Sequence, residues 1–324
     1  MKAVIAHEFG PPESMNLEET PTPEPGPGEV RIAIRAAGVN FVDVLTAAGG
    51  YQVKPPLPFI PGTEFAGVID AVGEGVTGRK VGDRVSGSGF GGGYAEYAIR
   101  AAASTSPIPD TMNFVDGATF RVSSSTSYYA LVQRAQLQPG ETVLVLGAAG
   151  AVGLAAIQIA KALGARVIAT ASNEAKRQLA RESGADQAID NAAADWRDQI
   201  KALTGGKGVD VVVDPVGGDA TERAFRSLAW KGRHLVIGFA TGAIPRLPTN
   251  LALLKGAQLM GVDIRQFGIF EPETSAANQQ AVLKLHAEGK LWPVITERLP
   301  LTDFRDAMQR TASGAVAGRI VLEI

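Results

Sequence analysis

The pattern of hydrophobic and polar positions changes along the chain, and the change divides it into parts. Near the amino terminus Val30, Ile32 and Ile34 alternate with arginine and alanine, which is typical of a half-buried β-strand. Further short strands punctuated by glycine are expected at residues 65–72, 84–85 and 94–99. Short strands separated by turns predict a small, irregular β-barrel in the first third of the chain.

The middle of the chain alternates strand-like and helix-like segments. An apolar strand is predicted at residues 142–146, and a helix at about 152–163 follows it. The alternation then continues with a strand at 166–170, a helix at 174–182, and strands at 209–213, 235–237 and 258–262. Strands that alternate with helices at this spacing predict a parallel, doubly wound sheet.

The tail is expected to return to the first domain and to end on a strand at residues 319–324. We therefore predict two domains. The first combines residues 1–121 with 266–324, and the second comprises residues 122–265. A length of 324 residues fits two domains better than one hydrophobic core.

Composition narrows the class of protein. Hydrophobic residues make up 45% of the chain and charged residues 20%, which is typical of a globular protein. The net charge of −2 and the lack of a basic stripe argue against nucleic acid or an anionic membrane as a partner. With 0 cysteines, neither a disulfide framework nor a thiolate metal site can form, and we expect a reducing, cytoplasmic location.

One uncharged stretch, residues 143–160, is long enough to consider as a membrane span. However, its glycines stand between a β-branched run and an alanine-rich run, which favours a strand, a tight turn and a buried helix. Such a glycine turn lets a dinucleotide pyrophosphate approach the backbone and the helix N-terminus. We expect cofactor contacts from Gly150, Ala151, Val152 and Gly153, the alternative being an ordinary strand–helix turn.

The residues after the second strand of the doubly wound sheet bear on the choice of cofactor. An NAD site usually places an acidic residue here, but Ala171 stands at this position. The hydroxyl of Ser172 and the cations of Lys176 and Arg177 suit a 2′-phosphate, which predicts NADPH. The alternative is a solvated helix start with Ser172 as its N-cap, and both can hold together. Glu174 argues mildly against the phosphate site.

Four motifs carry a family resemblance that covers nearly the whole chain: residues 36–43, 61–68 and 81–85 and the glycine loop at 147–153. In this order they resemble the medium-chain dehydrogenases, and the forms of the first and last resemble the quinone oxidoreductase (zeta-crystallin-like) branch. The resemblance implies a GroES-like β domain, a Rossmann domain, and an active site in the cleft where the nicotinamide emerges. It also implies a homodimer paired along the edge of the last Rossmann strand, which would otherwise stay unpaired.

Zinc-dependent members of the superfamily hold their catalytic zinc with a cysteine at the position of Asn40 and a histidine at that of Thr63. Neither ligand type is present there, and the three histidines (His7, His234 and His286) lie outside these motifs. We therefore expect no metal in the mechanism.

The resemblance also implies roles for individual residues. In place of the metal, we expect the Asn40 amide and the Tyr51 hydroxyl to polarise the substrate carbonyl, with Thr63 beside them. The alternatives are a buried turn residue for Asn40 and a packed aromatic for Tyr51. Asp43 is expected to anchor the loop. Asn40 also belongs to the expected cofactor contacts, which include Thr126, Tyr129, Asn191, Phe239 and Arg319. Asn191 stands where the family usually has a tyrosine.

These features favour an NADPH-dependent oxidoreductase that transfers hydride to a quinone or related conjugated carbonyl without zinc. The first alternative is an enoyl or enone reductase acting on an acyl-CoA or unsaturated acid, which Arg121 and Arg265 would favour if they line the pocket instead of the surface. A second alternative, of another class, is a structural or RNA-binding protein that retains NADPH.

Overall fold

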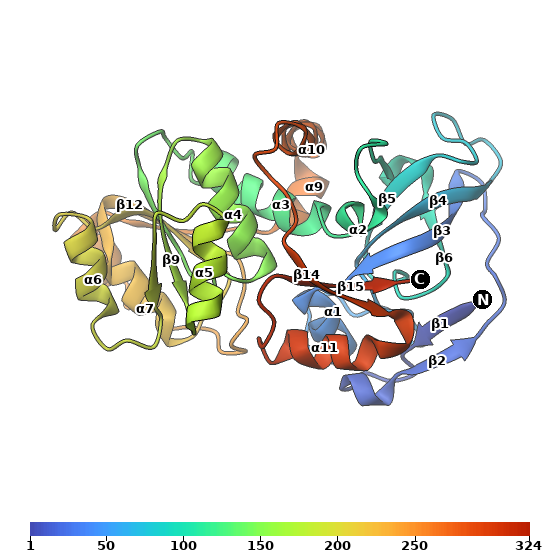
Figure 1. The fold of residues 1–324 in the computed structure, drawn as a ribbon, viewed down its shortest axis with the longest axis horizontal. Coiled ribbons are helices and arrows are strands. Elements are labelled where there is room, and N and C mark those ends of the chain that lie inside the picture. The colour runs from blue at the N-terminus through green and yellow to red at the C-terminus, as the bar shows by residue number, and fades with distance from the viewer. The chain divides into compact units, whose positions relative to one another are not determined.

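The computed structural model describes all 324 residues and divides the chain into two compact units (Figure 1). Unit 1 comprises Met1–Val122 and Pro293–Ile324, and unit 2 comprises Ser123–Trp292. The first predicted boundary is off by one residue. The predicted return to the first domain at residue 266 is wrong, because the chain returns only at Pro293.

The late return reflects the helices α9 (Ile264–Phe270) and α10 (Pro272–Ala287), which pack within unit 2. Tyr129 stacks on Phe267 with ring centroids 4.0 Å apart, and the Gln133 amide donates to Asn278 Oδ1 at 3.0 Å. These contacts tie both helices to the segment that opens unit 2.

Unit 1 is built on a sheet in the order β14-β15-β3-β4-β5-β7, with β6 paired to β3. Beside it lies a hairpin of β1 (Lys2–Ile5) and β2 (Asn16–Glu19). The alternating strand of the sequence is β3, whose apolar side chains enter a core with Phe65, Tyr94 and Phe304. The sheet strands are β3 (Glu29–Gly38), β4 (Glu64–Val72), β5 (Arg84–Ser88), β6 (Tyr97–Ala101), β7 (Ser106–Pro107), β14 (Ile295–Pro300) and β15 (Arg319–Glu323).

Short helices complete unit 1. They are α1 (Phe41–Ala47), α2 (Phe114–Gly117) and α11 (Phe304–Ala312), with the single turns η1 (Pro12–Ser14), η2 (Ala102–Ser104) and η4 (Leu301–Asp303). The last strand, β15, lies between β14 and β3, so residues from both ends of the sequence share one sheet.

Unit 2 is a six-stranded parallel sheet in the order β10-β9-β8-β11-β12-β13. Numbered from its first strand this is 3-2-1-4-5-6, the Rossmann order. Figure 1 shows α4 and α5 on one face of this sheet and α6 and α7 on the other. The strands are β8 (Thr142–Val145), β9 (Arg166–Ala171), β10 (Gln187–Asp190), β11 (Val209–Asp214), β12 (Leu228–Val236) and β13 (Gln258–Gly261). The helices are α4 (Ala151–Ala162), α5 (Glu174–Glu182), α6 (Trp196–Leu203), α7 (Asp219–Arg226) and α8 (Asn250–Lys255).

The serine-rich segment forms α3 (Arg121–Tyr128), which continues into a π-helix, η3 (Tyr129–Arg134). Its serines are buried, and Ser127 Oγ donates to the Val152 carbonyl at 2.9 Å in the first turn of α4. The Ser127 hydroxyl thus joins α3 to α4 by a hydrogen bond that an apolar side chain could not give.

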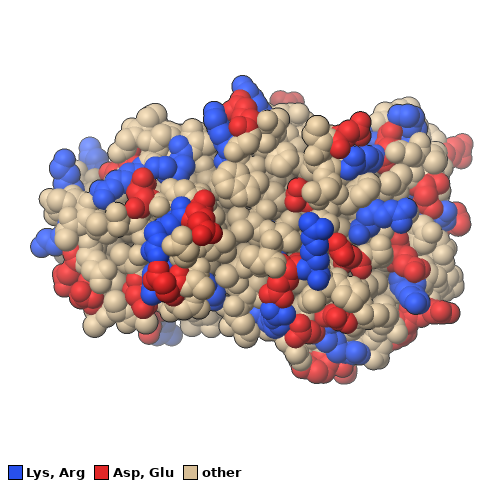
Figure 2. Space-filling view, in the orientation of Figure 1, with Lys and Arg blue, Asp and Glu red and all other residues tan.

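The uncharged stretch at residues 143–160 is the strand β8 and most of α4, as the glycines predicted, and no helix is long and apolar enough to cross a membrane. Figure 2 shows basic and acidic side chains interspersed over the face in view, without a stripe of one sign.

Candidate active site and cofactor site

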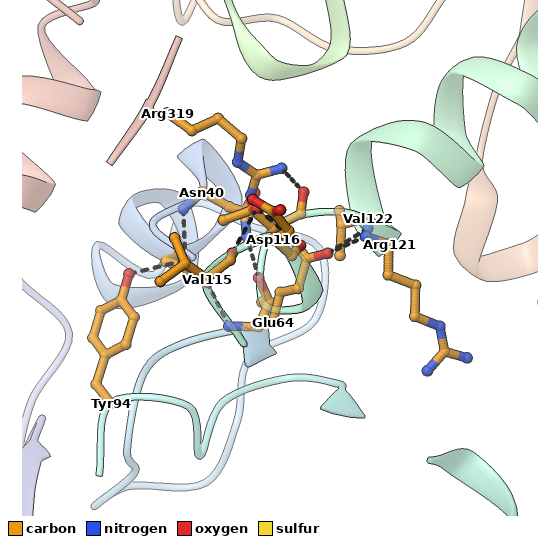
Figure 3. A network of polar contacts seen from close by, with 11 residues as sticks. Asn40, Glu64, Tyr94, Val115, Asp116, Arg121, Val122 and Arg319 are labelled. Carbon is orange, nitrogen blue, oxygen red and sulfur yellow. Dashed lines mark hydrogen bonds and ion pairs between the residues drawn. The ribbon is translucent and has the colours of Figure 1, made fainter. Parts of the chain in front are cut away.

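A buried polar network in unit 1 gathers three of the residues singled out in the sequence, Asn40, Thr63 and Arg319. Figure 3 labels Asn40 and Arg319 within it. The Asn40 amide donates to Thr63 Oγ1 at 3.3 Å, and its Oδ1 accepts from Arg319 Nη2 at 2.8 Å. Asn40 is also the N-cap of α1, in a capping box with Asp43. Both ends of the Asn40 amide therefore have protein partners, and its side chain is 8% exposed.

The centre of the network is Glu64, which the sequence interpretation did not single out. It is 0% exposed and lies 3.0 Å from the guanidinium of Arg319 through Oε2. Its Oε1 accepts from the backbone N–H groups of Arg121 and Val122 at 2.5 and 2.8 Å. A fully buried ion pair of this kind is stable only when further hydrogen bonds satisfy its remaining atoms, as they do here.

Arg319 connects this network to β15, the carboxyl-terminal strand. Its guanidinium contacts Glu64, Asn40 and the Thr119 carbonyl, and the residue is 3% exposed. These contacts hold Asn40 and Glu64 in place, and the expected cofactor contact of Arg319 stays a prediction.

Asp43 anchors its loop as predicted, and its environment is unusual. One oxygen accepts from the Asn40 N–H at 2.8 Å and the Tyr94 hydroxyl at 3.0 Å, and the other accepts from the Thr63 N–H at 2.8 Å. Burial raises the pKa of Asp43 to about 6 despite these donors, because none of them carries a charge.

The sequence singled out two further residues of unit 1, Tyr51 and Arg121. Tyr51 contacts Phe90, with ring centroids 5.8 Å apart. Arg121 donates its backbone N–H to Glu64, and Figure 3 shows its side chain directed away from the network. Its guanidinium donates to the Ser104 carbonyl at 3.2 Å, and burial lowers its pKa.

In unit 2 the glycine loop has the geometry that a pyrophosphate requires. Gly147 lies at φ 56°, and a Cβ on Gly153 would come within 2.5 Å of the Gly147 carbonyl oxygen, so a side chain is excluded there. The loop leads into Gly150, the N-cap of the 12-residue helix α4. The first N–H groups of that helix, from Ala151 onward, have no partner within the helix and can receive an anion. The residues present thus fit a dinucleotide.

At the adenosine end, parallel pairing of β9 and β10 brings Ser172 and Asn191 together, because the Asn191 N–H donates to the Ala171 carbonyl at 3.3 Å. Ser172 is exposed, but it is not the N-cap of α5. That role belongs to Asn173, whose side chain accepts from the Lys176 N–H at 2.9 Å.

Of the two cations predicted for the 2′-phosphate, Arg177 has carboxylate partners. The Arg177 guanidinium lies 2.9 Å from Glu174 and 3.1 Å from Asp190, so two carboxylates already neutralise it. Arg177 would therefore bind a 2′-phosphate in competition with these two carboxylates.

Two buried residues near the cofactor loop were missed. Asp214, at the end of β11, accepts from Val216 and Gly217 N–H groups through Oδ1, both at 2.9 Å. Its Oδ2 accepts from Thr221 at 2.6 Å and from His234 Nε2 at 3.0 Å. Burial alone would raise the pKa of Asp214, but His234 and the other donors lower it. The acidic residue after a buried strand, followed by Pro-Val-Gly-Gly, was the available signal.

The loop that Asp214 fixes adjoins two expected cofactor contacts. A Cβ on Gly147 would come 2.8 Å from Val216, and one on Gly217 would come 2.9 Å from the ring of Phe239. Asp214 therefore positions the wall of the glycine loop. Thr126 and Tyr129 are buried in the helices that open unit 2, with 7% and 8% exposure.

Comparison with known proteins gives the same two parts. The model of the alcohol dehydrogenase GroES-like domain matches residues 26–110, and that of the zinc-binding dehydrogenases matches residues 151–280. No group of three or more histidine, aspartate or glutamate side chains that could hold a metal ion is present.

Whole-length relatives include the quinone oxidoreductase-like protein 2 homolog of Nematostella vectensis, 36% identical over 99% of this chain and 88% of its own length. The quinone oxidoreductase of Homo sapiens is 35% identical over 99% of this chain and 97% of its own length. Among solved structures, Escherichia coli quinone oxidoreductase complexed with NADPH has a TM-score of 0.92 at 31% identity, and all of both chains is covered. The CurK enoyl reductase has a TM-score of 0.90 at 27% identity, and the match covers 99% of this chain and 98% of the CurK chain.

Proposed function

Because this chain belongs to the quinone oxidoreductase family of the medium-chain dehydrogenases, we propose that it reduces a quinone with NADPH and without zinc. The observation that carries the proposal is the replacement of both metal-ligand positions by Asn40 and Thr63, joined to each other in a buried polar network beside a charged Glu64–Arg319 pair. NADPH, when bound, supplies the hydride, and the protein binds and orients the reactants.

In this proposal unit 2 binds the dinucleotide. The N–H groups at the start of α4 receive the pyrophosphate, and Lys176 with Ser172 and Asn191 receives the 2′-phosphate. A charge-assisted hydrogen bond contributes roughly 1.5–3 kcal/mol. Lys176 alone should therefore favour NADPH over NADH by about 10- to 100-fold.

Unit 1 holds the acceptor oxygen. Arg319 orients the Asn40 amide through Oδ1 at 2.8 Å, and the Asn40 NH2 group donates to acceptors at 3.3 and 3.5 Å. An acceptor oxygen at normal hydrogen-bond length would compete well with such long bonds, because hydrogen bonds weaken as they lengthen. Tyr51 supplies a hydroxyl and an aromatic ring on the same unit.

The test is NADPH oxidation by the purified protein with a panel of quinones and linear enones. We expect turnover with quinones, a preference for NADPH over NADH, and no change after exhaustive chelation. Asn40→Ala should lower kcat by about 10²–10³-fold while leaving NADPH affinity nearly unchanged. Lys176→Ala should weaken NADPH binding, whereas Arg177→Ala, the matched control at a neutralised cation, should weaken it much less.

The panel also separates the alternatives. Turnover of an enoyl substrate but of no quinone would favour an enoyl reductase, the activity named for the structural neighbour CurK. Tight NADPH binding with no turnover of any acceptor would favour a binding role. If Asn40→Ala keeps full activity with both acceptor types, Asn40 is a structural residue. Polarisation of the acceptor carbonyl would then be assigned to Tyr51.

We further propose a homodimer joined along β13. This strand is the edge of its sheet and pairs only with β12. Large apolar side chains are exposed around it, including Trp230 (68%), Leu253 (79%) and Leu259 (52%). An unpaired apolar edge of this kind invites a partner strand. Light scattering at micromolar concentration should give twice the chain mass, and Leu259→Lys should give a monomer.

A cytoplasmic location belongs to the same proposal. It rests on the absence of cysteine and on the small net charge. Fractionation of cells that express the protein tests it.

A further inference from the structure

A buried histidine in unit 2 contacts the carboxylate that shapes the cofactor loop. His234 of β12 is 0% exposed, and its Nε2 lies 3.0 Å from Asp214 Oδ2. The lowered pKa of Asp214 keeps this carboxyl charged at neutral pH, and a charged carboxylate can only accept hydrogen bonds. The hydrogen between the two groups is therefore carried by Nε2, and His234 is the donor.

Packing alone does not explain a histidine at this position. The residues beside it on the two neighbouring strands are Val212 of β11 and Leu259 of β13, and the ring of Phe225 lies 5.8 Å from the imidazole. An apolar side chain would suit such surroundings, because a buried polar atom without a partner costs free energy. The Nδ1 atom of His234 is buried without a partner, so the contact that compensates for this cost is the one with Asp214.

Asp214 transmits this contact to the loop that follows β11. Its Oδ1 accepts from the N–H groups of Val216 and Gly217, both at 2.9 Å, and its Oδ2 accepts from His234 and from the Thr221 hydroxyl at 2.6 Å. Both oxygens belong to one planar carboxylate, so the donors to Oδ2 set the direction in which Oδ1 faces the loop. Gly217 lies at φ 72°, a conformation that glycine permits but does not impose, so these hydrogen bonds give the loop its shape.

The loop after β11 is also joined to the loop after β12. The Ala240 N–H donates to the Pro215 carbonyl at 3.2 Å, and the Thr241 N–H donates to the Val216 carbonyl at 3.1 Å. His234 lies on the strand that leads into the second loop and contacts the carboxylate that shapes the first. The histidine thus stands at the base of both loops.

These loops lie where a doubly wound sheet binds its ligand. In the order β10-β9-β8-β11-β12-β13 the chain order reverses between β8 and β11, and ligands of such sheets bind outside the carboxyl ends of the strands at this point. The glycine loop follows β8 and residues 215–218 follow β11, so the two loops border this place on either side. A Cβ on Gly147 would lie 2.8 Å from Val216, which shows how closely they approach.

We propose that His234 is a positioning residue for the dinucleotide, which holds residues 215–218 through Asp214 in the form that receives the cofactor. The inference rests on the proposed function only in that unit 2 binds a dinucleotide, and it does not depend on the acceptor. The 2′-phosphate is expected at Lys176, beyond β9 on the other side of β8. His234 therefore acts on the part of the cofactor that NADPH and NADH share, and loss of its hydrogen bond should weaken both by the same factor.

The experiment measures the dissociation constants of NADPH and NADH by calorimetric titration for wild type, His234→Gln and His234→Met. A glutamine amide reaches about as far as the imidazole Nε2 and keeps a donor for Asp214, whereas methionine has nearly the size of glutamine and no donor. We expect His234→Met to weaken both cofactors by about 3- to 10-fold, part of the contribution of a charge-assisted hydrogen bond. The ratio of the two constants should stay within about twofold of its wild-type value, and His234→Gln should bind both cofactors within about twofold of wild type.

Two other variants serve as controls. His286→Met removes a histidine of α10 whose Nδ1 lies 2.9 Å from the Leu291 carbonyl, and it should leave both constants unchanged. Lys176→Ala should give the opposite pattern to His234→Met, because it removes a contact that only NADPH makes.

The comparison of the two His234 variants separates positioning from packing. If the histidine only fills space, glutamine and methionine should act alike, or methionine should be the better replacement because it is apolar. Equal affinities of His234→Gln and His234→Met would therefore overturn the proposal. A loss confined to NADPH in His234→Met would overturn it as well, because the effect would then lie at the 2′-phosphate.

Thr221→Val tests the same carboxylate by another route and decides the matter if His234→Met does not fold. It removes the second donor to Asp214 Oδ2 and should weaken NADPH and NADH in equal proportion. Wild-type affinity for both cofactors in Thr221→Val would refute the role assigned to this oxygen and to its donors.

The readout is binding, so it separates this proposal from the proposed function. NADPH binding without reduction of any quinone would contradict the proposed function, and the effect of His234→Met on binding could still be measured. Equal weakening of both cofactors would then support the positioning role on its own. Absence of NADPH binding to wild type would refute both proposals.

Discussion

Asp43 and Asp214 are both buried, each accepts several hydrogen bonds, and yet their pKa values move in opposite directions. Asp43 in unit 1 is surrounded by backbone N–H groups and hydroxyls, which are neutral, and its pKa rises to about 6. Asp214 in unit 2 has His234 among its donors, and its pKa falls. Burial dominates where the donors are neutral, and an ionisable donor reverses the outcome.

The two carboxyls also differ in what they hold. Asp43 joins the start of α1 to the Thr63 backbone, within the candidate acceptor site. Asp214 shapes the loop against the glycine turn of the candidate cofactor site. Each unit thus uses one buried aspartate to fix a turn, and only the electrostatic setting is different.

The largest effect should come from Glu64, the third buried carboxylate, which has a full cation as partner. Glu64→Gln leaves Arg319 as an uncompensated buried charge and should lower the free energy of unfolding by about 3–5 kcal/mol. Urea denaturation of wild type and Glu64→Gln measures this loss. Glu64→Gln combined with Arg319→Met should cost less than the sum of the single changes, and strict additivity would show that the pair is not coupled.

Asp43 should make stability fall as pH rises. Its pKa in the fold, about 6, lies above its value in the unfolded chain, so the native state binds the extra proton and loses this advantage as pH passes through 6. Between pH 4.5 and 7 the loss should be about 2 kcal/mol.

Asp43→Asn provides the comparison, because it lacks this titration. Urea denaturation measures the free energy of unfolding of both proteins. The value for Asp43→Asn minus the value for wild type should rise by about 2 kcal/mol from pH 4.5 to pH 7. A constant difference between the two proteins would contradict the raised pKa.

Asp214→Asn should cost about 1–2 kcal/mol, because an amide cannot accept from all four donors. The pH dependence has the opposite sign to that of Asp43. The lowered pKa of Asp214 stabilises the fold above the pKa of the unfolded chain, and that stability is lost as pH falls through the folded value. The cost of Asp214→Asn should therefore shrink in acid, and NADPH affinity should fall because the loop loosens. Unchanged NADPH affinity would remove Asp214 from the cofactor site.

The smallest effects should come from a matched pair that removes one hydroxyl donor from each aspartate. Tyr94→Phe and Thr221→Val should each cost about 1 kcal/mol by thermal or urea unfolding. Tyr94→Phe should raise the pKa of Asp43 further, because a donor to the charged form is lost. A fall in that pKa would show that burial does not dominate there.

Much of this architecture could be read from the sequence, because it depends on local periodicity and turn chemistry. The strands β8, β9, β11 and β13 and the helices α4 and α5 were predicted within one residue at each end, and the glycine loop stands where the pattern placed it. The strand β12 begins seven residues before its predicted start, and β10 was not predicted. The helices α9 and α10 were missed, and their place in unit 2 depends on tertiary contacts such as Tyr129 with Phe267, which leave no periodic signal.

The candidate site was less predictable for the same reason. Asn40 and Thr63 could be found from their motifs, but their link to Glu64 and Arg319 joins residues 255 positions apart. The ion pair of Arg177 with Asp190 could not be predicted, because Asp190 lies on the next strand and not beside Arg177 in sequence.

The late position of Arg319 has a consequence for the order in which the protein can be made. Glu64 and Asn40 leave the ribosome more than 250 residues before the arginine that pairs with them, and β15 completes the sheet of unit 1 only then. Unit 2, which is continuous in sequence, can fold while the chain is still growing. The acceptor site is therefore assembled last, so a nascent chain can hold a finished dinucleotide fold before it has any means of reducing a substrate.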